Sequence, residues 1–208
     1  APLLSSKLLR AQINACLAIC IAEPERVAQA MEKLLFSRHA VHRLEAAFIL
    51  GYVPGEESAA TLHRVAVADS SHPVRVQAIK SLVRQPPLLA AGRLLAVVDA
   101  GDPATAGLAA RAIGELGVNG SSEVVTELCK REAGAPPEIR GALLRSVGSL
   151  SGILPTRQSM ALLIERASDT HPDVAIGALE GMKHLGDQLP STDLSHCDRN
   201  LHPGIRVL

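Results

Sequence analysis

The sequence predicts an all-α fold, an α-solenoid of about six antiparallel helix pairs. The main observation is a motif that returns every 31 to 35 residues, with equivalent positions at His42, Val74, Thr105, Ile139, Val174 and Ile205. A repeat of this length is typical of stacked supersecondary units. Aromatic residues make up 1% of the chain and apolar residues 47%, so the core is expected to consist of small aliphatic side chains. No stretch shows the alternation of a strand.

Each repeat contains two helical segments, as the stretch from 72 to 99 illustrates. His72-Pro73 starts the first helix, because proline fits an early helical position. Val74, Ala78, Ile79 and Leu82 then form one helical stripe. Pro86-Pro87 ends this helix, and the second helix is expected from 88 to 98.

The whole chain, 1–208, is interpreted as a single repeat domain. Its approximate repeats are 3–36, 37–69, 70–99, 101–133, 135–169 and 170–198, with the start of a further repeat at 199–208. We therefore expect a fragment of a longer protein. One helix pair cannot bury its apolar stripe alone, so neighbouring pairs should stack and curve around a concave face.

Charge and hydropathy limit the classes of partner. The chain has 21 basic and 21 acidic residues, and its net charge is zero. A nucleic-acid binder needs a basic excess to displace counterions, so no nucleic-acid partner is predicted. No apolar run approaches the roughly 18 residues of a membrane helix, so no direct membrane insertion is predicted. The oligomeric state does not follow from the sequence.

The four cysteines, Cys16, Cys20, Cys129 and Cys197, are scattered and form no disulfide framework. Cys16 and Cys20 are four residues apart on one face of an expected helix. We interpret them as small buried hydrophobic residues. Free cysteines favour a reducing compartment, which indicates a cytoplasmic location.

These features resemble HEAT repeats, especially the short bacterial repeats named after the phycobilisome lyases. The resemblance covers about residues 38–208, with a weaker copy at 3–36. It implies antiparallel helix pairs whose second helices line the inner surface. It also implies an armadillo-like superhelix.

In HEAT proteins an Asp that closes one repeat often binds an Arg that opens the next helix. The resemblance therefore implies a ladder of such contacts, in which Asp69 would bind Arg75. Asp198 with Arg206, and Glu132 with Arg140, match at a looser spacing. Ala106 and Ala175 stand at the arginine position of two repeats, so the ladder should be interrupted there.

No catalytic, metal or cofactor site is predicted. His72, His171 and His202 recur before proline, which favours a structural role in closing a loop or capping a helix. His39, His42 and Glu45 have a spacing that could hold a metal. His42, however, takes a position that Val, Thr or Ile fills in other repeats, which favours partial burial. Adjacent side chains point in different directions, so His196-Cys197-Asp198 is not a nucleophile with its base.

The candidate working surface consists of polar residues on the second helices: Arg64, Arg93, Glu127, Lys130 and Arg166, with His63 beside them. The sequence therefore favours a non-enzymatic scaffold that binds another protein through its concave surface. An alternative, which follows only from the resemblance, is a subunit of a bilin chromophore lyase or isomerase, or another HEAT-based enzyme. A nucleic-acid scaffold is a third alternative, and the neutral charge disfavours it.

Overall fold

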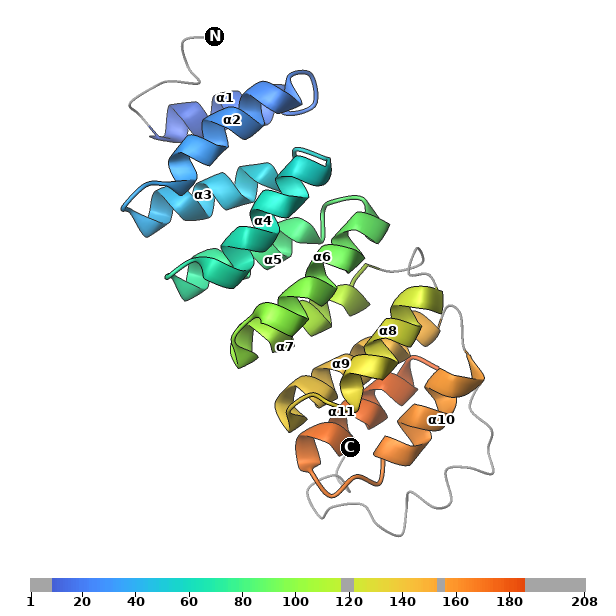
Figure 1. Ribbon diagram of the computed structural model, residues 1–208. Helices are drawn as coiled ribbons and strands as arrows, with labels where there is room; N and C mark the ends of the chain where they lie inside the picture. Colours follow the sequence, from blue (N-terminus) through green and yellow to red (C-terminus); the bar gives the residue numbers. More distant parts are fainter. Residues whose placement is uncertain (1–8, 117–121, 153–155, 186–208) are drawn as a thin grey trace. The chain divides into compact units, whose positions relative to one another are not determined.

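The computed structural model describes residues 9–116, 122–152 and 156–185 (Figure 1). These residues form eleven helices and no strand, so the all-α fold is confirmed. The helices are α1 (Leu9–Ile19), α2 (Pro24–Leu35), α3 (Ala40–Leu50), α4 (Glu56–Ala68), α5 (His72–Leu82), α6 (Pro87–Ala100), α7 (Pro103–Gly114), α8 (Ser122–Glu132), α9 (Pro137–Ser151), α10 (Arg157–Arg166) and α11 (Pro172–Lys183). None of them is long and apolar enough to cross a membrane.

The chain divides into two compact units, and helix α7 contains the boundary between them. Unit 1 comprises residues 1–105 and unit 2 comprises residues 106–208. Most of the expected repeats fall within one unit or the other. The fourth, 101–133, begins in unit 1 and continues in unit 2.

Unit 1 contains two layers of helices. The first helices of the pairs pack against one another, α1 on α3 and α3 on α5, and the second helices α4 and α6 also pack together. Fully buried Met31, Ile49, Leu50, Leu62 and Leu82 fill the space between the layers. Burying an aliphatic side chain of this size contributes about 1.5–3 kcal/mol, so these side chains are a main source of stability.

Unit 2 has the same kind of packing. Helix α9 lies against α11 and α8, and helix α10 contacts α8, α9 and α11. Leu128, Leu143, Leu144, Leu150 and Leu163 are its large buried side chains. Leucine and small residues therefore fill this core, as the composition predicted.

Prolines and short polar motifs set the helix starts. Proline stands in the first turn of α2, α5, α6, α9 and α11, where its missing N–H needs no partner. Helix α10 instead begins with a capping box, in which Thr156 and Ser159 satisfy each other's main-chain N–H groups. The breaker segments Pro54-Gly55 and Pro86-Pro87 lie between helices or at a helix start. The breaker segments at 119–120, 154–155 and 189–190 lie outside the described residues.

His72 and His171, the described histidines before proline, do not cap helices, although capping was one of the roles expected from the sequence. His171 has the position of an N-cap, but its side chain makes no capping hydrogen bond. The carboxylate of Asp169 instead accepts a hydrogen bond from the His171 main-chain N–H at 2.9 Å. Asp69 does the same for the N–H of Ser71 at 2.8 Å. The aspartate two residues earlier therefore closes these turns. His202 lies outside the described residues.

Small residues recur where first helices of neighbouring repeats meet within a unit. A Cβ atom added to Gly51 would lie 2.8 Å from Ser81 Cβ, and one added to Gly114 would lie 3.2 Å from Ser146 Cβ. A Cβ atom on Gly148 would lie 2.2 Å from Gly181 Cα. These contacts link residues 30 to 33 positions apart, which is one repeat. Gly51 has a φ of −63°, so close packing, and not a left-handed cap, requires glycine there.

Candidate functional site

An arginine–aspartate ladder joins neighbouring repeats. Arg43 on α3 binds the Asp69 carboxylate with two hydrogen bonds, Nε to Oδ2 at 2.7 Å and Nη2 to Oδ1 at 2.9 Å. The two side chains are 13% and 8% exposed. Arg75 Nε on α5 lies 3.3 Å from Asp102 Oδ2. Arg140 on α9 lies 3.2 Å from Asp169. Each arginine therefore binds the acid that precedes the next first helix.

This geometry corrects the pairing that the resemblance implied for Asp69. The Asp69 carboxylate binds Arg43, from the preceding helix pair, and not Arg75. Arg75 still contacts Asp69, because its Nη1 donates to the Asp69 main-chain oxygen at 2.8 Å. While its Nη1 is held there, its Nε lies near Asp102 and donates a hydrogen bond to Thr105 Oγ1 at 3.2 Å. Asp198 and Arg206 lie outside the described residues.

Two opposing effects act on the ionisation of Asp69. Burial raises the pKa of this carboxyl group, whereas the hydrogen bonds from Arg43 and the Ser71 N–H and the charges of Arg43 and Arg75 lower it. The net effect is a lowered pKa, so Asp69 is ionised at neutral pH. The pair is therefore a structural one, with no proton to exchange near pH 7.

Glu132 adds a buried cluster beside the Arg140–Asp169 contact of the ladder in unit 2. Its side chain is 1% exposed, and its Oε1 accepts hydrogen bonds from Arg140 Nε at 2.8 Å and Arg166 Nε at 2.9 Å. Arg166 also binds Glu165 and is 24% exposed. Arg166 was predicted to contact a partner, but in the structure it neutralises a buried carboxylate. A test of partner binding should therefore leave Arg166 intact.

Glu127 and Lys130 form an exposed ion pair on α8 at 2.7 Å, and Arg131 also binds Glu127. The hydrogen bonds from Lys130 and Arg131 lower the pKa of the Glu127 carboxyl group. Exposed pairs of this kind contribute little to stability. These residues are in unit 2, as Arg166 is, so the predicted contact residues are divided between the two units.

Arg64 and Arg93 lie on second helices of unit 1. Arg93 on α6 binds Glu56 on α4. Arg64 on α4 is 71% exposed, and its Nη2 lies 4.0 Å from Glu32 and 3.2 Å from Thr61 Oγ1. The neighbouring His63 has a buried Nε2 atom without a hydrogen-bond partner among the described residues. Arg64 is therefore the more accessible of the two arginines.

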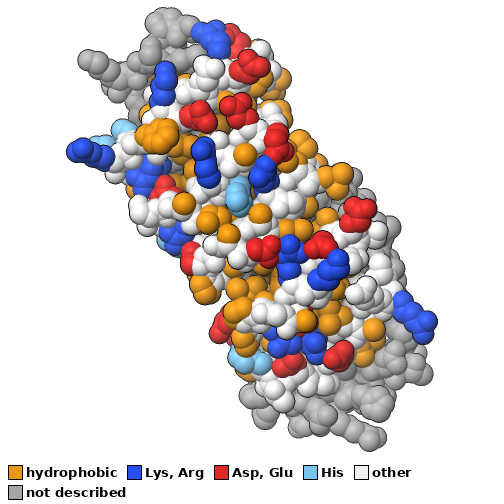
Figure 2. All heavy atoms as spheres, in the orientation of Figure 1, with side chains coloured by type: hydrophobic (Ala, Val, Ile, Leu, Met, Phe, Trp, Pro, Cys, Tyr) orange, Lys and Arg blue, Asp and Glu red, His pale blue; other side chains and the backbone are white. Residues whose placement is uncertain are grey.

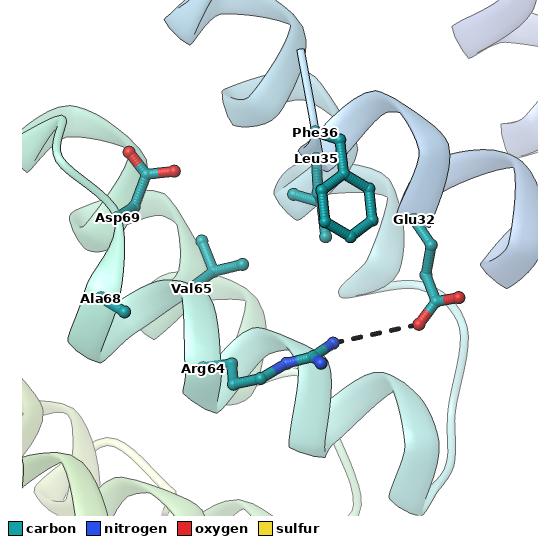
Figure 3. Close-up of a pocket in the computed structure, with 7 residues that line it drawn as sticks. All are labelled: Glu32, Leu35, Phe36, Arg64, Val65, Ala68 and Asp69. Atoms are coloured by element: carbon teal, nitrogen blue, oxygen red, sulfur yellow. Dashed lines mark ion pairs between the residues drawn. The ribbon is translucent and has the colours of Figure 1, made fainter. Parts of the chain in front are cut away.

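Arg64 borders a pocket of about 560 Å³ between α2 and α4, which we call the α2–α4 pocket (Figure 3). Its lining is Glu32, Leu35, Phe36, Arg64, Val65, Ala68 and Asp69. Figure 3 shows Leu35 and Phe36 on one side, facing Val65 and Ala68 of α4 across the space. The volume is within the range of about 300–1,000 Å³ for ligand pockets. An apolar interior with charged groups at its border suits an amphipathic ligand.

Phe36 is the most unusual residue of this pocket. It is 88% exposed, although large aromatic side chains are normally buried. The chain contains only two phenylalanines, one tyrosine and no tryptophan, so an exposed one is conspicuous. Figure 2 shows that acidic, basic and apolar side chains are interspersed on the face drawn.

The described residues contain no group of three His, Cys, Asp or Glu side chains that could hold a metal. The rings of His39 and His42 are 5.2 Å apart, and His42 Nδ1 lies 3.1 Å from Ser37 Oγ. This arrangement lies at the start of α3, where His39 is the N-cap position and His42 is in the first turn. Cys16, Cys20 and Cys129 are free and buried, and burial raises the pKa of the Cys129 thiol to about 11. That thiol is therefore not a nucleophile at neutral pH.

No protein-family model matches the chain, and none of the curated proteins is detectably similar to it. The site is therefore described by its geometry alone. Reasoning from the sequence missed Arg43, Phe36 and the pocket. Arg43 could have been found, because arginine recurs at 43, 75 and 140, one residue after each repeat start. Phe36 could not, because its position at the end of α2 gave no sign that it is exposed.

Proposed function

We propose that this protein is a non-enzymatic helical-repeat scaffold that binds another protein through the surface of its second helices. The repeats would stack as a HEAT-like α-solenoid. The small-residue contacts of one repeat with the next, in both units, support this architecture. The ladder from Arg43 to Asp69 and from Arg75 to Asp102 supports it as well.

The α2–α4 pocket is the observation that carries the proposal. An exposed aromatic ring beside an apolar pocket, with an accessible arginine at its border, combines the residue types that contribute most at protein interfaces. A large aliphatic side chain of the partner would fill the space between Phe36 and Val65. Arg64 would bind a carboxylate of the partner and exchange its long contact with Glu32 for a shorter one.

A photo-crosslinking residue at position 36 tests this function in lysate of the source cell. The matched control is the same residue at position 21, because Ile21 is 89% exposed and Phe36 is 88% exposed. We expect a discrete crosslinked protein from position 36 and none from position 21. Adding Arg64→Glu should abolish that product. Identical products from both positions, or a product that survives Arg64→Glu, would contradict the proposal.

A cytoplasmic location is part of the proposal. It is supported by the free state of Cys16, Cys20 and Cys129, since thiols persist in reducing compartments.

A further inference from the structure

Arg84 forms an exposed cluster with two aromatic rings in unit 1. Its guanidinium carbon lies 5.3 Å from the centre of the Phe48 ring and 4.9 Å from the centre of the Tyr52 ring. The two rings are 5.2 Å apart and meet edge to face at 69°. Two of the three aromatic residues of the chain are thus used to hold one arginine. Cation–π contacts of this kind stabilise the guanidinium group in one place.

No carboxylate of the described residues pairs with Arg84, and its side-chain N–H groups have no hydrogen-bond partner among them. This distinguishes Arg84 from Arg43, Arg75 and Arg140, each of which binds an acid. The two rings lie against the guanidinium group, but their π faces do not replace the oxygen acceptors that its N–H groups would bind. Arg84 therefore presents a positioned cation whose hydrogen-bond donors are free to bind an external group.

The main chain below this cluster is also fixed. Gln85 is 2% exposed, and its Nε2 donates to the carbonyl oxygens of Leu50 and Val53, each at 3.1 Å. Its Oε1 accepts from the Gly55 N–H at 3.1 Å. The Gln85 side chain thus ties the end of α5 to the loop after α3, the two segments that carry Arg84 and Tyr52. A ligand would meet a site that is already organised, which lowers the entropic cost of binding.

We propose that Arg84, Phe48 and Tyr52 form a binding site for a carboxylate in an acidic segment of a protein partner. The planar guanidinium group matches a carboxylate with two parallel hydrogen bonds. Tyr52, which is 40% exposed, offers its ring to the apolar part of the same segment. A single cation in a chain of zero net charge does not suit a nucleic-acid backbone, which needs many. The site uses none of the residues of the α2–α4 pocket and is independent of its function.

Two peptides with blocked ends, acetyl-Ala-Glu-Glu-Ala-amide and its Gln-Gln counterpart, test the charge requirement. The readout is the NMR signal of the Arg84 Nε–Hε group during titration of the whole chain. We expect a saturable shift with the glutamate peptide and at least tenfold weaker binding of the glutamine peptide. Arg84→Gln should abolish binding of the glutamate peptide. Because this variant lacks the Arg84 signal, its titration is followed by the main-chain N–H signal of Gly55. Tyr52→Leu, which removes the aromatic face and keeps an apolar side chain, should weaken binding several-fold.

Arg111→Gln is the matched control, because Arg111 is another exposed arginine that pairs with no carboxylate of the described residues, and this change should leave peptide binding unaltered. Equal binding of the two peptides, or glutamate-peptide binding that survives Arg84→Gln, would overturn the proposal. Tighter binding of an oligothymidylate than of the glutamate peptide would also overturn it, in favour of a nucleic-acid partner. Variants of Phe36 and Arg64 should bind both peptides like the wild type, so failure of the pocket and failure of this site give different results.

Discussion

Helices α3 and α5 of unit 1 and helices α9 and α11 of unit 2 have equivalent places in the repeat but pack differently. Between α3 and α5, the glycine Gly51 faces a residue with a side chain, Ser81. Between α9 and α11, glycine faces glycine or main chain at every close contact. The glycines concerned are Gly141, Gly148, Gly177 and Gly181.

Neighbouring first helices can therefore approach closely in two ways, with glycine against a small side chain or with glycine against glycine. A glycine within a helix costs about 0.5–1 kcal/mol relative to alanine, so four of them cost roughly 2–4 kcal/mol. The close approach of α9 and α11 must offset this cost through contacts between main-chain atoms. We therefore expect the α9–α11 interface to tolerate no side chain, and the α3–α5 interface to tolerate a small one.

Gly148→Val should have the largest effect. Its Cβ would lie 2.2 Å from Gly181 Cα, and main-chain atoms cannot rotate away. We expect a loss of more than about 3 kcal/mol in the free energy of unfolding, measured by urea denaturation. Gly107→Ala is the control in unit 2, because nothing lies within 4 Å of its added Cβ, and it should stabilise the protein. A Gly148→Val variant as stable as the wild type would show that α9 and α11 are further apart.

Glu132→Ala should be the next most harmful change. The alanine methyl group removes the carboxylate that Arg140 and Arg166 share. We expect a loss of about 3 kcal/mol in the free energy of unfolding, because removing one partner exposes the desolvation cost of the others. Glu127→Ala, on the exposed face of the same helix, should change it far less, because solvent screens an exposed ion pair. Similar values for the two variants would argue against a buried cluster.

Gly51→Ala tests the tolerance of unit 1. The added methyl group would crowd Ser81, whose Cβ would be 2.8 Å away. We expect a loss of about 1–2 kcal/mol in unfolding free energy. The double variant with Ser81→Gly should recover most of it, because the new methyl group then has room. Absence of recovery would mean that the main chain of α5, and not the Ser81 side chain, limits the approach.

Asp69→Asn should have the smallest effect, on the order of 1 kcal/mol at pH 7, and that effect should depend on pH. The folded protein lowers the pKa of this carboxyl group, so its contribution is present above the unfolded pKa of about 3.9. It is lost as the pH falls through the folded pKa. The stabilities of wild type and variant, measured by denaturation from pH 7 to pH 2, should therefore converge at low pH. A constant difference would contradict the ion pair with Arg43.

The sequence was sufficient for the helices but not for their contacts. The recurring motif and the prolines correctly predicted the all-α fold and the start of α5 at His72, and they placed the start of α6 within one residue. The resemblance paired Asp69 with Arg75, and Arg75 does bind the Asp69 main-chain oxygen, but the fold brings Arg43 to the Asp69 carboxylate from 26 residues away. Arg166 looked like a surface residue, because nothing nearby in the sequence indicates that Glu132 is buried beneath it. The pocket depends on how α2 and α4 approach, which no local pattern encodes.

The ion pairs that join repeats also affect how the chain can fold. Those between neighbouring repeats connect residues close in sequence, from 26 positions for Arg43 and Asp69 to 37 for Arg93 and Glu56. Structures built from such local contacts tend to fold quickly. During synthesis, a helix pair could complete its ion pair as soon as the next pair has emerged from the ribosome. Assembly could therefore proceed in step with translation and would leave little apolar surface open at any moment.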